Sequence, residues 1–253
     1  MRLTFLGTGT STGVPQIGCK CGVCTSADPR DKRLRTSVLI EDEDTCILLD
    51  CGPDFREQML RHPRFRPLDS VLITHEHYDH VGGLDDLRPF CVFGEVHVYS
   101  DSYCCNHLRE RIPYCFAEHK YPGVPQIHLT EIKPHQTLKI KNIAVTPFRV
   151  MHGKLPILGF RLNDLVYITD MKTIEPSEMD YARGCKTLVV NGLRHTPHPS
   201  HQTIEEAIAF SESLGSPDTY LIHMGHHAGL HADSDQFLPP HIRSAYDGLA
   251  IDC

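Results

Sequence analysis

The chain has 253 residues, of which 40% are hydrophobic and 23% are charged, as expected for a globular protein large enough to bury a sizeable core. Its formal net charge of −7 argues against broad non-specific binding of nucleic acid, and no apolar run approaches the roughly 18 residues of a membrane span. The N-terminal apolar stretch is too short for a signal peptide, so we expect a cytoplasmic protein that does not engage a membrane.

Residues 1–253 are expected to form a single domain, because no linker, repeat or low-complexity tract divides the chain. Runs of apolar and β-branched residues predict strands at 3–6, 37–41, 45–50, 70–74, 96–100, 126–131, 136–140, 143–150, 157–162, 165–169, 187–190 and 219–223. Helices are expected at 54–62, 81–87, 101–111, 175–182 and 203–214. Strands interspersed with helices in this way predict a layered α/β fold with two sheets faced by helices.

Eleven cysteines and 18 histidines are the unusual part of the composition. In a chain without a secretion signal, cysteines are better interpreted as thiols and metal ligands than as a disulfide framework. The composition therefore points to metal chemistry.

The densest group of metal-binding side chains directly follows the apolar part of the expected strand at 70–74. His75, His77, Asp79 and His80 form the pattern His-x-His-x-Asp-His. A strand end holds such side chains rigidly on the loop that follows it. Four donors exceed what one tetrahedral ion needs if it also keeps a position open for substrate, so the pattern predicts two metals.

Three more residues with metal-binding side chains stand just past expected strands: His152, Asp170 and His223. Each of them alone would be an ordinary loop residue. Four strand ends that each deliver histidine or aspartate predict one shared site.

With these residues the chain resembles the metallo-β-lactamase-fold hydrolases, which are αββα four-layer sandwiches with a binuclear site at the strand ends. The resemblance spans nearly the whole chain and implies two ligand sets and a bridge, namely His75, His77 and His152 on one metal, Asp79, His80 and His223 on the other, and Asp170 between them. It also implies that Asp50 supports the ligands from behind. Imidazole and carboxylate donors suit Zn, Mn or Fe.

A second cluster lies on a glycine-rich loop, where Cys19, Cys21 and Cys24 are spaced for three thiolates on one ion. A structural zinc site needs four ligands, and three free thiols are the alternative. The motif resembles the cyclic-phosphate phosphodiesterases of the carbon–phosphorus lyase pathway. That resemblance implies a structural zinc with His226 as the fourth ligand, and the adjacent His227 is the alternative.

The same subfamily implies one further histidine after the strand that follows the bridging aspartate. His201, just before the expected helix at 203–214, is the best positional match, and His195 and His198 are the alternatives. His201 would protonate the leaving alkoxide or hold a non-bridging oxygen. His201 and Asp79 are the residues expected to be catalytic.

The resemblance implies a phosphodiesterase that hydrolyses a small cyclic or diester phosphate, of the phosphoribosyl cyclic phosphate or 2′,3′-cyclic nucleotide type. A hydroxide bridging two metals would attack phosphorus in line. Met171 follows Asp170 where the relatives usually carry a small hydroxyl residue, so it is expected to reshape the substrate pocket. The relatives are often homodimers, but no segment of the sequence displays a dimer surface.

Three other functions remain in view. A tRNA 3′-processing endonuclease shares the fold and ligands, but it normally grips tRNA with a basic arm rich in glycine and proline, which this sequence does not show. A lactamase or thioester hydrolase is disfavoured by the cysteine loop. A non-catalytic metal-storage or sensing module would have no need of a bridging carboxylate.

Overall fold

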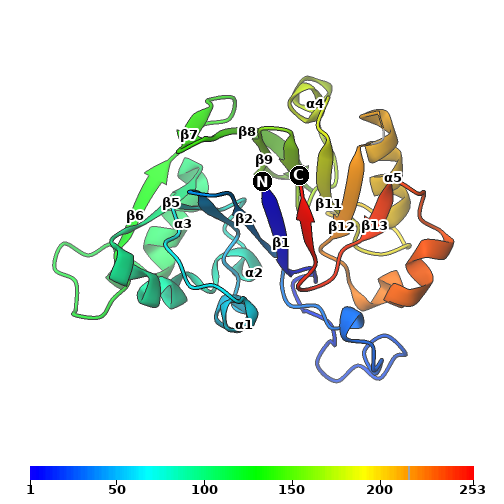
Figure 1. Ribbon diagram of the computed structural model, residues 1–253, viewed down its shortest axis with the longest axis horizontal. Coiled ribbons are helices and arrows are strands. Elements are labelled where there is room, and N and C mark those ends of the chain that lie inside the picture. Colours follow the sequence, from blue (N-terminus) through cyan, green and yellow to red (C-terminus); the bar gives the residue numbers. More distant parts are fainter. Residues whose placement is uncertain (216) are drawn as a thin grey trace.

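The computed structural model describes residues 1–215 and 217–253, and its strands form two seven-stranded sheets (Figure 1). The first sheet has the order β14-β1-β2-β3-β4-β5-β6. Its strands are β1 Arg2–Gly7, β2 Ser37–Glu41, β3 Cys46–Leu49, β4 Ser70–Leu72, β5 Val96–Ser100, β6 Ile127–Glu131 and β14 Ala250–Asp252. The second sheet has the order β13-β12-β11-β10-β9-β8-β7. Its strands are β7 Leu138–Ile140, β8 Ile143–His152, β9 Leu155–Leu162, β10 Leu165–Tyr167, β11 Thr187–Asn191, β12 Asp218–Ile222 and β13 Ile242–Ser244.

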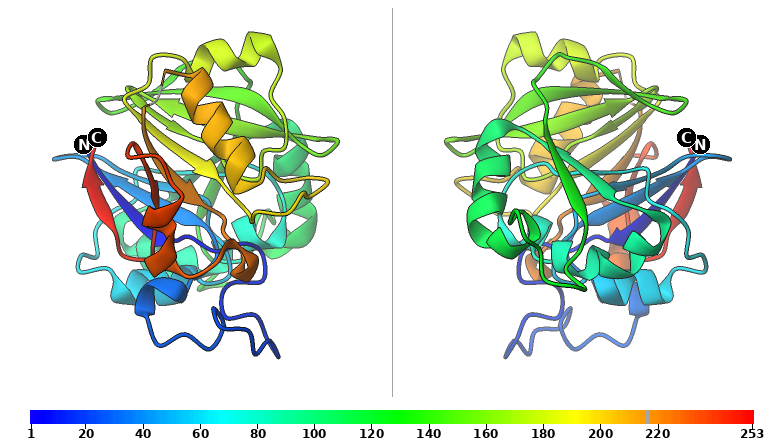
Figure 2. Two further views of the ribbon diagram at one scale, coloured as in Figure 1. Left: turned by 90° about the vertical axis from the view of Figure 1, so that its right-hand side faces the viewer. Right: turned by 90° about the vertical axis from the view of Figure 1, so that its left-hand side faces the viewer.

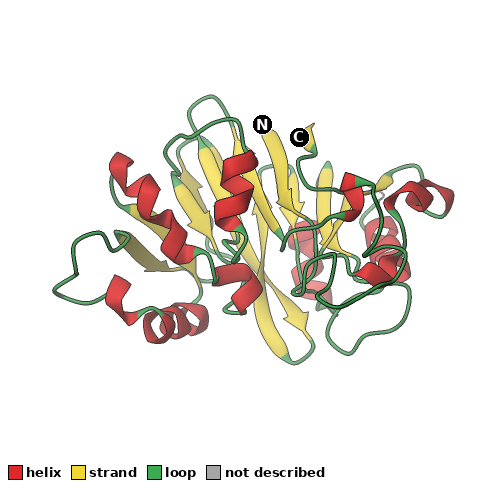
Figure 3. Ribbon diagram, turned by 90° about the horizontal axis from the view of Figure 1, so that it is seen from below, coloured by secondary structure: helices red, strands yellow, loops and turns green. Residues whose placement is uncertain are grey.

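Helices cover the outer faces of both sheets, and the strands run through the middle of the molecule (Figure 3). The α-helices are α1 Phe55–Arg61, α2 Tyr78–Val81, α3 Ser102–Arg111, α4 Pro176–Ala182 and α5 Ile204–Ser213. Short 3₁₀ segments are η1 Pro29–Asp31, η2 Leu84–Phe93, η3 Pro113–Cys115, η4 His226–Ala228 and η5 His231–Gln236. The arrangement confirms the predicted αββα layers.

Three apolar clusters correspond to the three spaces between the layers. Strand residues alternate between the two faces of a sheet, so Leu3 and Phe5 of β1 enter the cluster between the sheets, whereas Leu6 joins the cluster beneath the helices of the first sheet. A third cluster, which includes Val190 and Ile204, packs helices on the second sheet. Because both faces of each sheet are buried over the central strands, those strands appear in the sequence as nearly continuous apolar runs.

The helix expected at 81–87 is wrong. The chain instead forms the short helix α2, which ends at Val81, and the 3₁₀ segment η2, which begins at Leu84. Gly82 and Gly83 separate the two, and a Cβ atom on Gly83 would lie 2.1 Å from the carbonyl oxygen of Gly52. This close approach of two backbones holds the loop after β3 against the loop after β4.

The sequence patterns also missed the edge strands β13 and β14. β14 pairs antiparallel with β1, with Arg2 opposite Asp252, and the two ends of the described chain therefore lie side by side (Figures 1 and 2). Within the described residues, no helix combines the length and apolar character needed to cross a bilayer.

Candidate active site and metal centres

The His-x-His-x-Asp-His motif occupies the turn between β4 and α2. His75 precedes the helix, His77 is its N-cap residue, and Asp79 and His80 lie in its first turn. The change from extended to helical backbone makes successive side chains point in different directions. The motif therefore contributes to two groups of potential ligands rather than to one.

Each group is compact, because its ligand atoms all lie within 4.8 Å of one another. The first group consists of His75, His77 and His152. The second group consists of Asp79, His80, Asp170 and His223. The structure thus brings together all seven residues predicted from the sequence, from strand ends as far apart in the chain as residues 75 and 223.

Asp170 lies between the two groups. Its Oδ2 is 3.1 Å from Nε2 of His80 and its Oδ1 is 3.2 Å from Nε2 of His223, both in the second group. Asp170 also forms a compact set with His152 of the first group and with His201. A carboxylate in this position can offer one oxygen to each of two neighbouring ions.

Hydrogen bonds fix the protonation pattern of three histidines. Nδ1 of His80 donates to Asp50 Oδ2 at 2.9 Å, and Nδ1 of His152 donates to the carbonyl oxygens of Asp170 and Ser200 at 2.9 and 2.8 Å. Nδ1 of His75 lies 3.0 Å from Oγ1 of Thr74, whose hydroxyl donates to Asp50. A proton on Nδ1 leaves the Nε2 lone pair free for a metal.

Asp50 occupies the supporting position expected from the resemblance. Its side chain is fully buried after β3 and accepts hydrogen bonds from the Thr74 amide at 2.9 Å and from the Tyr167 hydroxyl at 3.2 Å, in addition to the one from His80. It thereby joins the turn after β4 to β10 of the opposite sheet. Thr74, Tyr167 and Ser200 were not identified in the sequence, where nothing distinguishes them from other core or loop residues.

Three of these residues share an uncommon backbone conformation. Asp50, Asp170 and His223 each follow a strand and have φ values of 58°, 58° and 53°, in the left-handed region. Such a conformation costs a non-glycine residue on the order of 1 kcal/mol or more, although aspartate and histidine tolerate it better than most. The fold therefore maintains local strain at three strand ends of the site.

The buried carboxylates of the second group favour the binding of a cation. Burial opposes ionisation of His80, but the carboxylates of Asp79, Asp170 and Asp50 outweigh it and raise the His80 pKa well above its ordinary value. Burial likewise opposes ionisation of Asp170, yet the neighbouring histidines, His223 first, hold its pKa well below the usual range. With no ion present, histidine protons must therefore balance the buried carboxylates, a role that a divalent ion would take over.

The orphaned nitrogen atoms provide a direct test of metal fit. Nε2 of His75 is buried and has no hydrogen-bond partner among the described residues, and Nε2 of His80 faces the carboxylates of Asp79 and Asp170 at 3.2 and 3.1 Å without a well-formed hydrogen bond. An unpaired buried nitrogen is costly in free energy, unless a metal uses its lone pair. The donor set therefore fits two divalent ions, and binding itself stays a prediction.

Of the three histidines considered for a catalytic role, the structure brings His201 to the cluster. Its Nδ1 is 3.6 Å from Asp170 Oδ1, and its ring stacks on that of His223 with 5.0 Å between centroids. Burial, with smaller contributions from nearby histidines, lowers the His201 pKa to about 3. His198 lies behind it at 4.9 Å between centroids, whereas His195 is exposed and paired with Glu205.

The cysteine loop also closes as predicted. Cys19, Cys21, Cys24 and His226 place their ligand atoms within 4.8 Å of one another, and Nδ1 of His226 is 3.3 Å from the Sγ atoms of Cys19 and Cys21. Tetrahedral zinc ligands are expected at roughly this spacing, given bond lengths of about 2.0–2.3 Å. The Cys24 amide and then His226 lower the Cys21 pKa to about 6, which favours the thiolate that a metal needs.

The expectation for Met171 is wrong. Its side chain is fully buried and belongs to the apolar cluster under α5, and its backbone amide donates to Asn191. It therefore contacts the core rather than a substrate pocket. Tyr78, between the metal-binding residues, is 61% exposed and is free to meet a ligand.

Comparison with known proteins agrees with this fold and site. A model of the beta-lactamase superfamily domain matches residues 45–224. The octanoyltransferase of Porphyromonas gingivalis is 49% identical over 251 residues, which are 98% of this chain and 51% of that protein, so the chain spans about half the length of this relative. A crystal structure described as a new diphosphatase from the PhnP family superposes with a TM-score of 0.91 at 36% identity, covering 99% of this chain and 97% of that one.

The short form of human tRNase Z has the same fold, with a TM-score of 0.69 at 18% identity over 100% of this chain and 99% of that one. The matched domain covers most of the chain, including the turn after β4, Asp170 and His223. The chain therefore belongs to the metallo-β-lactamase superfamily.

Proposed function

We propose that the protein is a binuclear metal-dependent phosphodiesterase that hydrolyses a small cyclic or diester phosphate. The observation that carries this proposal is the position of Asp170 between two compact donor groups, with His201 beside it. Two ions bound there would supply an activated water and offset negative charge on the phosphoryl oxygens. The side chains of the protein would then orient the ester and donate a hydrogen bond or a proton to the leaving oxygen.

His201 is suited to the leaving-group side of the reaction. It is largely buried, and its Nδ1 lies 3.6 Å from Asp170 Oδ1, so it stands next to the carboxylate that would lie between the two ions. Its lowered pKa keeps the imidazole neutral at pH 7, where an N–H can still donate to an ester or phosphoryl oxygen. Asp79 and Asp170 hold the charge balance of the second group and thereby the orientation of His80 and His223.

The likeness to the PhnP-family diphosphatase supports a phosphorus substrate, because that similarity extends over 99% of the chain at 36% identity. A small substrate is favoured over tRNA by the net charge of −7. The likeness to tRNase Z, at 18% identity, concerns the fold alone. Octanoyl transfer is named for a protein about twice as long as the match, and we do not extend it to this chain.

An activity panel tests the proposal. Protein reconstituted separately with Zn and with Mn is offered ribose 1,2-cyclic phosphate, 2′,3′-cyclic nucleotides, a linear diester, precursor tRNA and an octanoyl thioester. We expect the highest kcat/KM on a small cyclic or diester phosphate. Cleavage of precursor tRNA alone, or of the thioester alone, would overturn the proposal in favour of the corresponding activity.

Metal content provides a second check on the same site. We expect about three metal ions per chain, one that resists dialysis against a chelator and two that exchange. Cys21→Ser should remove the resistant ion and His80→Ala an exchangeable one. A total of one ion or none would rule out the binuclear centre.

A further inference from the structure

The loop at residues 192–203, between β11 and α5, carries a histidine that the proposed reaction does not use. His198 is half-buried, and the centroid of its ring lies 4.9 Å from that of His201. The His201 ring in turn lies 4.6 Å from the ring of the potential metal ligand His152. His198 itself belongs to none of the groups of potential metal ligands. It therefore borders the candidate active site without being one of its ligands.

Backbone hydrogen bonds close this loop at its base and hold it against the active site. The Leu193 amide donates to the carbonyl oxygen of Gln202 at 3.1 Å. The Ile204 amide donates to the carbonyl oxygen of Arg194 at 3.0 Å. The Gln202 amide donates at 2.9 Å to the carbonyl oxygen of Met171, the residue directly after the bridging carboxylate. Since the loop is fixed in this way, its backbone determines where its side chains stand relative to the site.

One residue of the loop, Ser200, orients both a metal ligand and His198. Its carbonyl oxygen accepts from Nδ1 of His152 at 2.8 Å. Its amide donates to Nδ1 of His198 at 3.3 Å, and its hydroxyl oxygen lies 3.3 Å from the same nitrogen. Because Nδ1 of His198 accepts a hydrogen bond from an amide, the proton of the neutral ring is on Nε2. The fold therefore selects the tautomer of His198 that carries an Nε2–H.

This Nε2–H has no partner within the protein. Nε2 of His198 forms no hydrogen bond with any residue that the structure describes, and it is not one of the unpaired side-chain nitrogens that are shut off from solvent. It is therefore an accessible donor beside the His201 ring. A donor whose ring is already held in place gives up little conformational freedom when a ligand binds, which favours affinity.

The surroundings of His198 suit an anionic ligand. Burial comes first, and then the charges of its neighbours lower the His198 pKa below its ordinary value; these neighbours are Arg194, His152, Lys172 and His223. The ring is therefore neutral at pH 7 and donates without adding a positive charge close to the metal ligands. Arg194 donates to two backbone carbonyl oxygens of the same loop and has no carboxylate at ion-pair distance within residues 1–215 and 217–253, so its charge is uncompensated.

We propose that His198 is a substrate-binding residue whose Nε2–H donates a hydrogen bond to a non-bridging oxygen of the phosphoryl group, beside His201. Two rings whose centroids are 4.9 Å apart can contact different oxygens of one phosphoryl group. His201 would act on the leaving oxygen, whereas His198 would hold an oxygen that carries negative charge before and after the reaction. Such a contact stabilises the bound substrate and the transition state alike, so it acts on KM rather than on kcat. This inference rests on the proposed function, because it names a further contact for the same substrate.

Steady-state kinetics of the metal-loaded protein on bis(p-nitrophenyl) phosphate provide the first test. Loss of one hydrogen bond to a charged oxygen should raise KM about tenfold in His198→Ala and change kcat less than threefold. Glutamine places an amide nitrogen close to the position of the imidazole Nε2, so His198→Gln should keep KM within about threefold of the unaltered protein. His195→Ala is the matched control, because His195 is an exposed histidine of the same loop that pairs with Glu205.

Calorimetric titration with inorganic phosphate tests the same contact without turnover. His198→Ala should bind phosphate about tenfold more weakly than the unaltered protein, and His198→Gln and His195→Ala should bind it nearly as tightly. Metal content should be the same in all four proteins, and thermal denaturation checks that each is folded. If this order of affinities is found although no diester is hydrolysed, the proposed function fails and the role of His198 in holding phosphate stands.

Four results would overturn the assignment of His198. The unaltered protein could fail to bind phosphate, or His198→Ala could bind it as tightly as His195→Ala does. His198→Gln could be as weak as His198→Ala, which would make the ring a packing element rather than a donor. Finally, His198→Ala could lose an exchangeable metal, or lower kcat with KM unchanged, which would place His198 in the metal site or in the chemical step.

Discussion

The two metal-binding clusters of this protein are built in opposite ways. The His/Asp cluster stands on strand ends, and its side chains are mostly buried and held by Asp50, Thr74 and carbonyl oxygens. The Cys/His cluster lies on an extended loop without strands, and two of its thiols are partly exposed. We therefore expect the first site to keep its shape without ions, and the loop of the second site to depend on a bound ion for its stability.

The clusters are nonetheless connected through the chain. His223 of the first cluster is three residues before His226 of the second, and Met224 between them exchanges backbone hydrogen bonds with Thr8 and Thr10 at the start of the loop. An ion on the cysteines would therefore fasten the loop beside the active site. The contrast predicts kinetic effects from changes in one cluster and stability effects from changes in the other.

The largest effect is expected from His80→Ala. This change removes a buried donor from the second group and leaves three carboxylates without it, so hydrolysis of bis(p-nitrophenyl) phosphate should fall by on the order of 10³-fold. His97→Ala, an exposed histidine on β5, is the matched control and should retain full activity. Equal activity in the two variants would show that the strand-end cluster is not catalytic.

Cys21→Ser is expected to act mainly on stability. Without the Cys21 thiolate the loop should no longer bind its structural ion. The free energy of unfolding, measured by chemical denaturation, should therefore decrease by roughly 3 kcal/mol. The kcat of the surviving folded protein should change less than threefold. Cys91→Ser, a partly exposed thiol outside both clusters, serves as the control. A fall in kcat without a change in stability would instead assign the thiols to catalysis.

The buried carboxyl group of Asp247 predicts how the stability of the protein depends on pH. Its side chain accepts hydrogen bonds from the backbone amides of Thr8 and Leu34, which lie on either side of the cysteine loop. Burial raises the pKa of Asp247 to about 6. The pKa in the unfolded chain is about 3.9, so the folded protein binds the extra proton and its stability should increase as pH falls from about 7 to 4. The gain is at most about 3 kcal/mol, at about 1.4 kcal/mol per pKa unit.

Asp247→Asn should lack this component, so the difference in unfolding free energy between the two proteins should change with pH over that window. Comparing the two proteins cancels any loss of metal in acid, which affects both. A difference that stays constant from pH 7 to 4 would contradict the buried-carboxyl interpretation.

A smaller loss of activity is expected when Asp50, which supports the metal-binding histidines, is changed. Asparagine has nearly the same shape as aspartate but carries no charge, so Asp50→Asn should weaken the hydrogen bond that Asp50 accepts from Nδ1 of His80. Metal affinity and activity should therefore fall about 10- to 100-fold. Tyr167→Phe removes one of several hydrogen bonds to Asp50 and should cost less. Metal titration followed by activity measures both variants. If Tyr167→Phe were the more damaging change, Asp50 would not be the residue that orients His80.

Much of the site could be predicted because its chemistry is concentrated in short patterns. His75, His77, Asp79 and His80 occupy six consecutive positions, and His152, Asp170 and His223 stand at ends of apolar runs that the sequence reveals as strands. The edge strands β13 and β14 were missed because they are three residues long and partly exposed, which leaves little apolar pattern to detect. The helix expected at 81–87 failed because close backbone contact at Gly83 overrides local preference.

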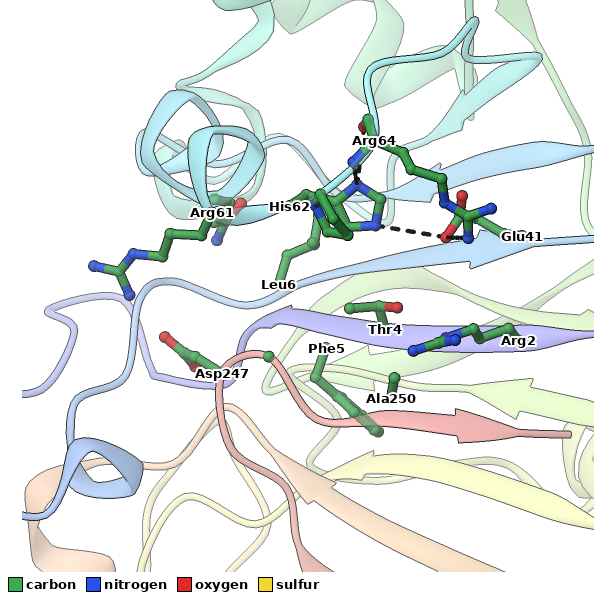
Figure 4. Close-up of a pocket in the computed structure, with 13 residues that line it drawn as sticks. Arg2, Thr4, Phe5, Leu6, Glu41, Arg61, His62, Arg64, Asp247 and Ala250 are labelled. Atoms are coloured by element: carbon green, nitrogen blue, oxygen red, sulfur yellow. Dashed lines mark hydrogen bonds and ion pairs between the residues drawn. The ribbon is translucent and has the colours of Figure 1, made fainter.

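The layered fold, the chemistry of the ligands and the presence of two separate clusters could all be predicted before folding was considered, since they depend on residue types and their local spacing. The folded chain was needed to show which of three histidines meets Asp170, which nitrogen His152 offers to a metal, and that Met171 lies in the core. These depend on contacts between residues far apart in the chain, such as those of Asp170 with His201 and of His152 with Ser200. A groove between α1 and the paired strands β1 and β14 is likewise lined by residues from both ends of the chain, among them Arg2, Thr4 and Ala250 (Figure 4).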